Sequence, residues 1–201
     1  MKTVFLFPGQ GSQYVGMGKN LYKKLDFAKK MYDNSCDILE YDIKEISFID
    51  KNNLLNQTKH TQPAIFIYST ILDFLLKDNN IVCEAVAGHS LGEISALVSN
   101  NSLNFEDGLN FIKKRSESMH LDGIKKSGKM IAVIDKNRQL IEELTIGENN
   151  ICIANYNSSK QHIISGETNL IHNFIKTAKS NGIKRIIELN VSGAFHSPLM
   201  K

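Results

Sequence analysis

Cysteine is scarce in this sequence of 201 residues, and no spacing pattern joins the three that it has. Cys36, Cys83 and Cys152 are odd in number and lie far apart, with no CxxC spacing. Disulfide scaffolds and zinc sites need paired or clustered cysteines, so the sequence argues against both. Isolated reduced thiols are typical of cytosolic proteins. We therefore expect a cytoplasmic protein in which all three cysteines serve in packing.

The sequence also lacks an excess of charge of either sign and a long hydrophobic run. Its 24 Lys and Arg against 21 Asp and Glu give a net charge of +3, too little to indicate nucleic-acid or membrane binding. The longest apolar-rich helix candidate, residues 64–76, is too short to span a bilayer and contains Asp73. The first residues lead straight into a strand-like run, so we expect no secretory signal peptide.

The first half of the chain alternates between strand and helix patterns. Residues 3–7 read as a buried strand, and residues 81–87 read as a second strand. Helices are predicted over residues 17–40, from Thr61-Gln62-Pro63 onward, and from Asn104, as a cap, to Met119. This order predicts an α/β layer.

The second half has a different order of elements. Its patterns predict strand, helix, strand, strand, helix and strand over residues 130–134, 138–144, 151–156, 162–165, 170–178 and 183–189. This β-α-β-β-α-β order is that of ferredoxin-like folds. We therefore expect a ferredoxin-like small subdomain over residues 127–190, inserted in a large α/β domain formed by residues 1–126 and 191–201.

One serine lies between two glycines in the stretch Gly88-His89-Ser90-Leu91-Gly92. This GxSxG pattern forms a nucleophile elbow when it joins a strand to a helix, as it is predicted to do here. The helix N-terminus and the amide after the serine can then stabilise an oxyanion. The same residues also suit a simple tight turn at a helix start, so the pattern alone leaves both interpretations open.

A nucleophilic serine needs a base, and His196 is the best-placed of six histidines. It follows a predicted strand, in a glycine-rich loop bounded by Pro198, where catalytic side chains often lie. The competing interpretation is an exposed loop histidine. His89 adjoins Ser90 and is expected to point away from it. The other four are expected to be surface or packing residues: His60, His120, His162 and His172.

Two further features are candidates for substrate contacts. Arg115 lies in Lys113-Lys114-Arg115, which also fits a solvated basic face. The loop Pro8-Gly9-Gln10-Gly11-Ser12-Gln13 follows the first strand and is suited to holding an amide against a substrate oxygen. It lacks the spacing and the lysine of a phosphate-binding P-loop.

Taken together, these motifs resemble the malonyl-CoA:acyl carrier protein transacylases, the acyltransferases of fatty acid and polyketide synthesis. The similarity runs along the whole chain, and the motifs are specific jointly rather than singly. They are Phe7-Pro8-Gly9-Gln10-Gly11-Ser12-Gln13, Thr61-Gln62-Pro63-Ala64, Gly88-His89-Ser90-Leu91-Gly92-Glu93, Lys114-Arg115 and Phe195-His196-Ser197.

The resemblance implies a role for each matching residue. Ser90 matches the acylated nucleophile and His196 its base. Gln10 and the backbone N–H of Leu91 match the oxyanion hole, and Arg115 matches the arginine that grips the malonyl carboxylate. Two more positions match substrate contacts: Asn155 beside the cleft, and Phe195 in the Ala194-Phe195-His196 form associated with malonyl selection.

The resemblance also implies a fold and an activity. The fold is a hydrolase-like α/β large domain with an inserted ferredoxin-like subdomain. The activity is malonyl transfer from malonyl-CoA to the phosphopantetheine thiol of acyl carrier protein through a malonyl-serine, in fatty acid biosynthesis, with no metal and no other cofactor. The partners expected are therefore malonyl-CoA and acyl carrier protein, with no nucleic acid and no membrane.

Two alternatives stay open at this point. A serine hydrolase or thioesterase shares the GxSxG pattern but has little use for a buried arginine facing the acyl chain, and Asp107, Asp122 and Asp135 are acid candidates without a supporting motif. Family members also continue past the histidine for about another third of their length. The resemblance therefore implies a fragment, the product of a split or interrupted gene, or one piece of a larger assembly. We expect the isolated chain to be poorly stable and inactive, with a separate C-terminal piece of the same enzyme as a further candidate partner.

Overall fold

The computed structural model describes residues 2–200 and divides the chain into two compact units, residues 1–117 (unit 1) and 118–201 (unit 2). The end residues of the expected large domain, Met1 and Lys201, lie outside the described residues. Within residues 2–200, no helix is both long and apolar enough to cross a bilayer.

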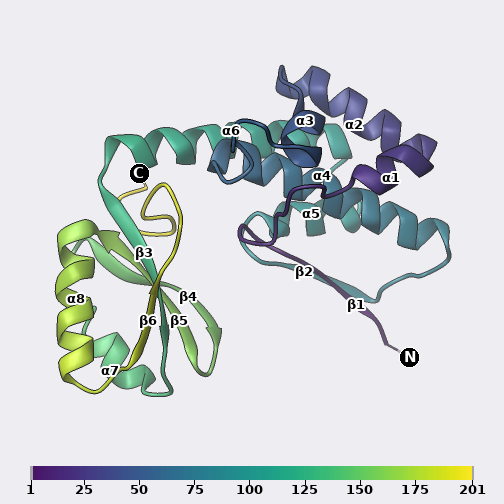
Figure 1. Ribbon diagram of the computed structural model, residues 1–201. Coiled ribbons are helices and arrows are strands. Elements are labelled where there is room, and N and C mark those ends of the chain that lie inside the picture. Colours follow the sequence, from purple (N-terminus) through teal and green to yellow (C-terminus); the bar gives the residue numbers. More distant parts are fainter. Residues whose placement is uncertain (1, 201) are drawn as a thin grey trace. The chain divides into compact units, whose positions relative to one another are not determined.

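Unit 1 combines a two-stranded parallel sheet with helices (Figure 1). The strands pair in register from Val4 with Ala85 to Phe7 with Gly88. Helix α5 packs against both strands. The elements are β1 (Val4–Phe7), α1 (Lys19–Lys24), α2 (Asp26–Leu39), α3 (Ile43–Phe48), α4 (Thr58–Asp78), β2 (Ala85–Gly88), α5 (Gly92–Ser99) and α6 (Phe105–Lys125), which continues past residue 117.

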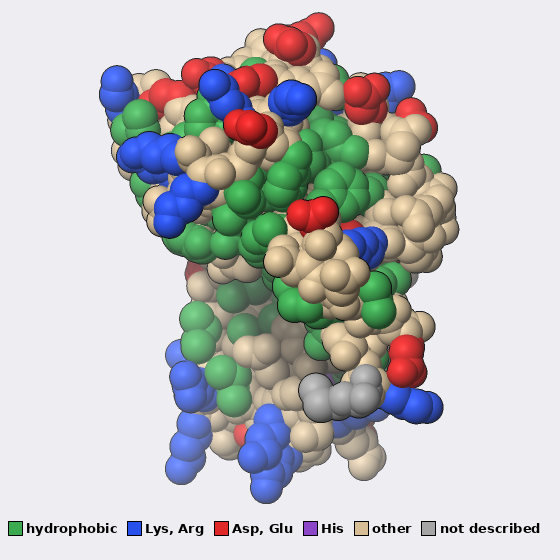
Figure 2. All heavy atoms as spheres, turned by 90° about the vertical axis from the view of Figure 1, so that its right-hand side faces the viewer, with side chains coloured by type: hydrophobic (Ala, Val, Ile, Leu, Met, Phe, Trp, Pro, Cys, Tyr) green, Lys and Arg blue, Asp and Glu red, His purple; other side chains and the backbone are tan. Residues whose placement is uncertain are grey.

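One face of this sheet carries exposed apolar side chains. Val4 and Leu6 of β1 are exposed, and their register partners Ala85 and Ala87 of β2 are exposed as well. Figure 2 shows the side of the molecule on which β1 begins, with hydrophobic atoms at the surface. The alternation of a strand places Phe7 on the other face, where it is buried.

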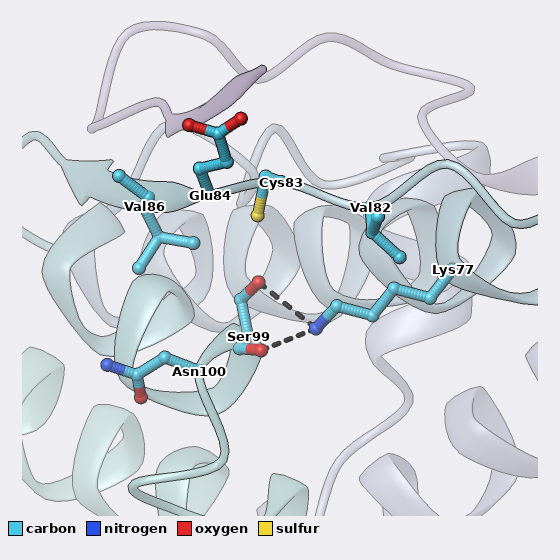
Figure 3. A pocket seen from close by; sticks show the side chains of 8 residues that line it. Lys77, Val82, Cys83, Glu84, Val86, Ser99 and Asn100 are labelled. Carbon is cyan, nitrogen blue, oxygen red and sulfur yellow. Dashed lines mark hydrogen bonds between the residues drawn. The ribbon is translucent and has the colours of Figure 1, made fainter. Parts of the chain in front are cut away.

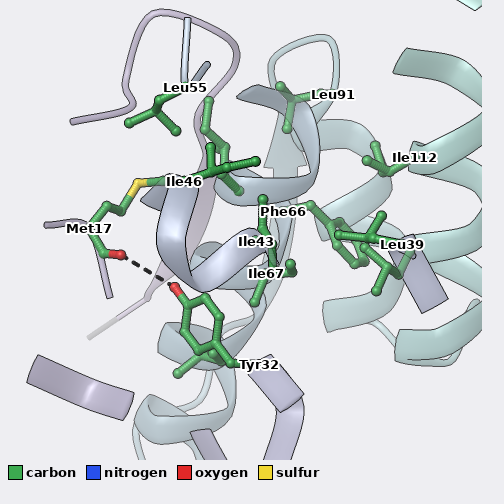
Figure 4. Packing of buried hydrophobic residues seen from close by; sticks show 14 of the residues in the cluster. Met17, Tyr32, Leu39, Ile43, Ile46, Leu55, Phe66, Ile67, Leu91 and Ile112 are labelled. Carbon is green, nitrogen blue, oxygen red and sulfur yellow. Dashed lines mark hydrogen bonds between the residues drawn. The ribbon is translucent and has the colours of Figure 1, made fainter. Parts of the chain in front are cut away.

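The core of unit 1 is helical (Figure 4). Tyr32, Phe66 and Ile67 are fully buried and pack with Met17 from the loop before α1. The Tyr32 hydroxyl donates to the Met17 carbonyl at 3.4 Å, so its polar atom has a partner in the core. Burial raises the pKa of this phenol far above its usual value.

Three predicted boundaries in unit 1 were wrong. The helix expected over residues 17–40 is two helices, because Leu25 is extended at φ −127°. The strand expected over 81–87 covers only Ala85–Gly88, since its partner β1 is four residues long. The helix expected to start at Thr61 starts at Thr58 instead.

Pro63 therefore lies inside α4 rather than in its first turn. A proline has no N–H, so the carbonyl four residues earlier, that of Lys59, loses its helical donor. In this structure that carbonyl accepts from the Tyr41 hydroxyl at 3.2 Å and from Ser116 Oγ at 3.4 Å. Tertiary donors thus replace the missing helical bond, and this explains why the helix tolerates the proline.

Unit 2 has the β-α-β-β-α-β order that was predicted. Its four strands form one antiparallel sheet in the order β4-β5-β3-β6. The elements are β3 (Gly128–Ile134), α7 (Arg138–Glu143), β4 (Ile151–Ser158), β5 (Gln161–Glu167), α8 (Thr168–Ser180) and β6 (Arg185–Glu188).

The two faces of this sheet have separate apolar clusters. On one face Ile131 and Val133 of β3 pack with residues of α7 and α8. On the other, Met130 and Ala132 pack with Phe195 from the segment after β6. This segment therefore belongs to unit 2, whereas residues 191–201 were expected in the large domain.

The other expected boundary also differs, because α6 runs without a break to Lys125. Its last turns approach the segment after β6 so closely that a Cβ on Gly123 would lie 2.5 Å from the carbonyl oxygen of Ser192. The division consequently falls within α6, at residue 117, rather than at residue 126.

An ion pair within α4 has a buried carboxylate, and Ser99 at the end of α5 is hydrogen-bonded to the same carboxylate. The Asp73 carboxylate is only 1% exposed. It accepts a hydrogen bond from Lys77 Nζ at 2.7 Å and another from Ser99 Oγ at 2.7 Å. By contrast, Lys44 and Asp33 form a pair of the same length with Asp33 43% exposed.

We predict that Lys77→Met lowers the free energy of unfolding by about 3 kcal/mol, because it leaves the buried Asp73 carboxylate without its cation. Lys44→Met removes an exposed pair and should cost about 0–1 kcal/mol. Urea unfolding followed by far-UV circular dichroism measures both. Equal losses in the two variants would contradict the assignment of a buried, structurally important pair.

Candidate active site

Ser90 lies at the corner between β2 and α5, in the strand–turn–helix context that the sequence predicts. Its φ is 54°, in the left-handed region that non-glycine residues rarely adopt. The His89 N–H donates to the Phe7 carbonyl at 3.0 Å, and the Gly92 N–H donates to the His89 carbonyl at 3.0 Å. The turn thus combines backbone strain with fixed hydrogen bonds, a combination associated with functional sites.

The glycines on either side of Ser90 are required by close backbone contacts. A Cβ on Gly88 would lie 2.1 Å from the carbonyl carbon of Gly92, and a Cβ on Gly92 would lie 2.3 Å from the carbonyl oxygen of Phe7. A Cβ on Gly9 would lie 2.6 Å from His89 Nδ1, so the loop after β1 lies against the same turn. Three glycines therefore let β1, β2 and α5 meet closely enough to hold Ser90 at the corner.

Arg115 lies beside Ser90. Its Nη2 donates to Ser90 Oγ at 2.9 Å, while Nη1 donates to Gln62 Oε1 of α4. Burial lowers the pKa of Arg115, and the nearby Glu93 carboxylate opposes this shift. The solvated-face interpretation of Lys113-Lys114-Arg115 is therefore wrong for Arg115, whereas its neighbour Lys114 is exposed.

Gln62 is a residue of this site that the sequence reasoning did not assign. It is 1% exposed and its side-chain oxygen accepts from the Arg115 guanidinium, which holds that group next to Ser90. The available signal was its place in Thr61-Gln62-Pro63, which indicates a helix start and contributes to the family resemblance but was given no role at the site.

The two predicted oxyanion-hole residues are both in unit 1. Leu91 directly precedes α5, and the first N–H groups of a helix have no intrahelical acceptor. Gln10 lies in the loop that contacts the Ser90 turn through Gly9, and its Nε2 donates to Thr58 Oγ1 at 3.2 Å. Their role in binding an oxyanion stays a prediction.

Three predicted site residues are in unit 2. His196 is exposed and left-handed, with φ 58°. Phe195 is 4% exposed and packs against Met130, Ala132 and Ile163. Asn155 is half-buried on β4 opposite Ile163, where a register shift interrupts the strand pairing. Their catalytic and binding roles stay predictions.

The remaining histidines mostly have the packing or surface positions that were expected. His60 is buried with its ring edge-on to Tyr41, at a centroid distance of 4.8 Å. His162 is buried edge-on to Tyr156, and burial lowers its pKa. His172 is exposed. His89 has its Nδ1 next to Gly9.

A pocket of about 670 Å³ lies along β2 and the residues before it, not at Ser90 (Figure 3). Its lysine, Lys77, donates to Asp73 and to both the carbonyl and Oγ of Ser99. This ammonium is therefore already paired. The pocket thus lacks the arrangement found at Ser90, where a hydroxyl lies beside a half-buried guanidinium.

The arrangement around Ser90 agrees with the relationships of the chain. Residues 4–201 match the profile of the acyl transferase domain. The chain belongs to this acyl transferase family. It is 38% identical over 204 residues to the malonyl CoA-acyl carrier protein transacylase of Bacillus subtilis, covering all of this chain and 64% of that protein.

Solved acyl transferases share its fold. The malonyl CoA-acyl carrier protein transacylase of Clostridium perfringens superposes with a TM-score of 0.91 at 35% identity, covering all of this chain and 64% of that one. A malonyl-transacylase in complex with a type II PKS acyl-carrier protein superposes at 0.92 with 28% identity, with 66% of that chain covered. The resemblance expected from the sequence is confirmed, and the chain spans about two thirds of the length of these relatives.

We predict that Gly88→Ala disrupts the Ser90 corner, because the added methyl group would overlap the backbone of Gly92 and Glu93. Overpacking of this kind costs about 1–3 kcal/mol and shifts the backbone. The control is Gly147→Ala, where φ is 87° but nothing lies within 4 Å of the added Cβ. Labelling of Ser90 by a serine-directed fluorophosphonate, measured on folded protein, should fall in Gly88→Ala and stay at the wild-type rate in Gly147→Ala. Wild-type labelling in both variants would contradict the packing argument.

Proposed function

We propose that the protein transfers a malonyl group from malonyl-CoA to the phosphopantetheine thiol of acyl carrier protein, in fatty acid biosynthesis in the cytoplasm. The observation that carries the proposal is the guanidinium of Arg115 within hydrogen-bond distance of Ser90 Oγ at a strained strand–helix corner. A nucleophile beside a half-buried cation suits an acyl group that itself ends in a carboxylate.

The types of fold that we assign to the two units support the same proposal. We assign unit 1 to a hydrolase-like α/β domain and the β-α-β-β-α-β sheet of unit 2 to a ferredoxin-like subdomain. Acyl carrier protein is the proposed acceptor, since a relative with 28% identity was solved with such a carrier. The chemistry needs no metal and no redox cofactor.

In the first half-reaction, Ser90 Oγ attacks the thioester carbonyl of malonyl-CoA while His196 accepts the hydroxyl proton. The carbonyl oxygen becomes an oxyanion, stabilised by the Leu91 N–H and by Gln10, and one such donor is worth about 3–4 kcal/mol. When the C–S bond breaks, the coenzyme A sulfur leaves with the proton from His196. The product is a malonyl ester on Ser90.

In the second half-reaction, the phosphopantetheine thiol of the carrier gives its proton to His196 and attacks the ester carbonyl. The same donors stabilise the second oxyanion, and the Ser90–acyl bond then breaks. His196 returns the proton to Ser90 Oγ, which restores the enzyme. A thiol therefore takes the place that water has in a serine hydrolase.

Arg115 supplies the selectivity in this scheme. Burial makes its charge costly, as the lowered pKa shows, so an incoming carboxylate would find a cation that gains by pairing. The planar guanidinium can offer two parallel hydrogen bonds to a carboxylate. Arg115 Nη1 donates to the side-chain oxygen of Gln62, which holds the guanidinium in place. Nη2 donates to Ser90 Oγ in this structure and would turn to the substrate carboxylate.

We predict that the gene product containing this chain gains one malonyl group on brief incubation with malonyl-CoA, and that Ser90→Ala does not. Intact mass and peptide mapping locate the adduct. Losing a nucleophile of this kind costs up to about 10⁶ in rate, so the difference should be unambiguous. The matched control, Ser102→Ala, removes an exposed hydroxyl shortly after α5 and should be labelled like the wild type.

Addition of acyl carrier protein should then move the malonyl group to the carrier. An adduct that persists in Ser90→Ala would overturn the nucleophile assignment. Rapid loss of the adduct to water, with no malonyl-carrier formed, would instead indicate a hydrolase.

A further inference from the structure

The backbone of His196 is in an uncommon conformation. Its φ of 58° is left-handed, a region that only a few per cent of residues with a Cβ adopt, so the contacts that hold it there matter. The side chain is exposed, and the direction in which it projects depends on the backbone that carries it. Contacts of the surrounding loop with this backbone therefore contribute to the placement of the imidazole.

Ser197, the next residue, forms hydrogen bonds with residues on both sides of His196 in the chain. Its buried Oγ donates to the Ala194 carbonyl at 2.6 Å and accepts from the Leu199 N–H at 3.3 Å. The Ser197 carbonyl accepts from the Met200 N–H at 3.1 Å. One side chain thus links the residues before His196 to those after it, which fixes the turn in which His196 lies.

Cys152 of β4 supplies a second contact, directly to His196. Its Sγ donates to the His196 carbonyl at 3.4 Å. Burial raises the pKa of the Cys152 thiol, so the thiol stays protonated at neutral pH and retains the hydrogen that it donates. A thiol is a weak donor, so this contact is the smaller of the two.

We propose that Ser197 and Cys152 are positioning residues for His196, which hold its backbone left-handed and thereby aim its imidazole. This inference rests on the proposed function for the role of His196 as the base of Ser90. Neither side chain has to touch substrate. Their action is to keep the imidazole in one direction, and a misplacement of about 1 Å can cost about 10²-fold in rate.

The chain offers matched controls for both residues. Ser180 Oγ donates to the carbonyl three residues earlier, that of Thr177, at 2.9 Å, the same local bond as in Ser197. Cys36 is a half-buried thiol whose Sγ lies 3.7 Å from Asp42 Oδ1, and burial raises its pKa as well. Neither control residue is in the loop around His196.

The test compares Ser197→Ala and Cys152→Ala with Ser180→Ala and Cys36→Ala in the gene product that contains this chain. Single-turnover malonylation of Ser90 is measured against pH and malonyl-CoA concentration. We expect Ser197→Ala to lower the maximal rate about 10- to 100-fold and Cys152→Ala a few-fold, with the KM for malonyl-CoA unchanged. Ser197→Thr and Cys152→Ser keep a donor and should recover most of the loss.

A second readout does not depend on activity. The imidazole resonances of His196 are followed by NMR through a pH titration, and we expect their shifts or midpoint to move in Ser197→Ala but not in Ser180→Ala. If the wild type fails to load Ser90, the proposed function fails, and the titration still decides whether Ser197 positions His196. Unmoved His196 resonances, or a rate that falls only in proportion to the unfolded fraction, would overturn the inference.

Discussion

The position of Ser90 depends on a contact between backbones that leaves no room for side chains. β1, β2 and α5 meet where Gly88 and Gly92 lie against each other and against Phe7. A Cβ at either glycine would overlap main-chain atoms, which cannot rotate away as a side chain can. Because these contacts fix both sides of the turn, Ser90 is held left-handed and its hydroxyl lies within reach of a residue from α6.

That residue, Arg115, adds an electrostatic constraint at Ser90. Arg115 is partly desolvated, and two groups compensate its charge: the Gln62 oxygen, by a hydrogen bond, and the Glu93 carboxylate, by Coulomb attraction. A partly desolvated guanidinium without a full counter-charge is a costly element of a fold, and such elements are concentrated at functional sites. In our account the missing counter-charge is the carboxylate of the substrate.

Local patterns in the sequence predicted much of this arrangement. The GxSxG stretch predicted the corner at Ser90, and hydrophobic periodicity predicted the β-α-β-β-α-β order of unit 2. What the sequence did not predict depends on contacts between distant residues. The helical position of Pro63 requires Tyr41 and Ser116 to satisfy a freed carbonyl. The role of Gln62 requires α4 and α6 to bring Gln62 and Arg115 within hydrogen-bond distance, which no local pattern encodes.

The most direct test of the account is the acyl selectivity of Arg115→Ala. A charged hydrogen bond is worth about 1.5–3 kcal/mol, so initial malonylation of Ser90 should fall about ten- to a hundredfold, while acetylation from acetyl-CoA should stay the same or rise. Arg115→Lys restores the charge without the planar fork and should recover only part of the loss. Lys114→Ala, at the exposed neighbouring residue, is the control and should load both acyl groups like the wild type. An equal fall of malonyl and acetyl loading in Arg115→Ala would contradict the account, because it would make this arginine a structural residue rather than the partner of the substrate carboxylate.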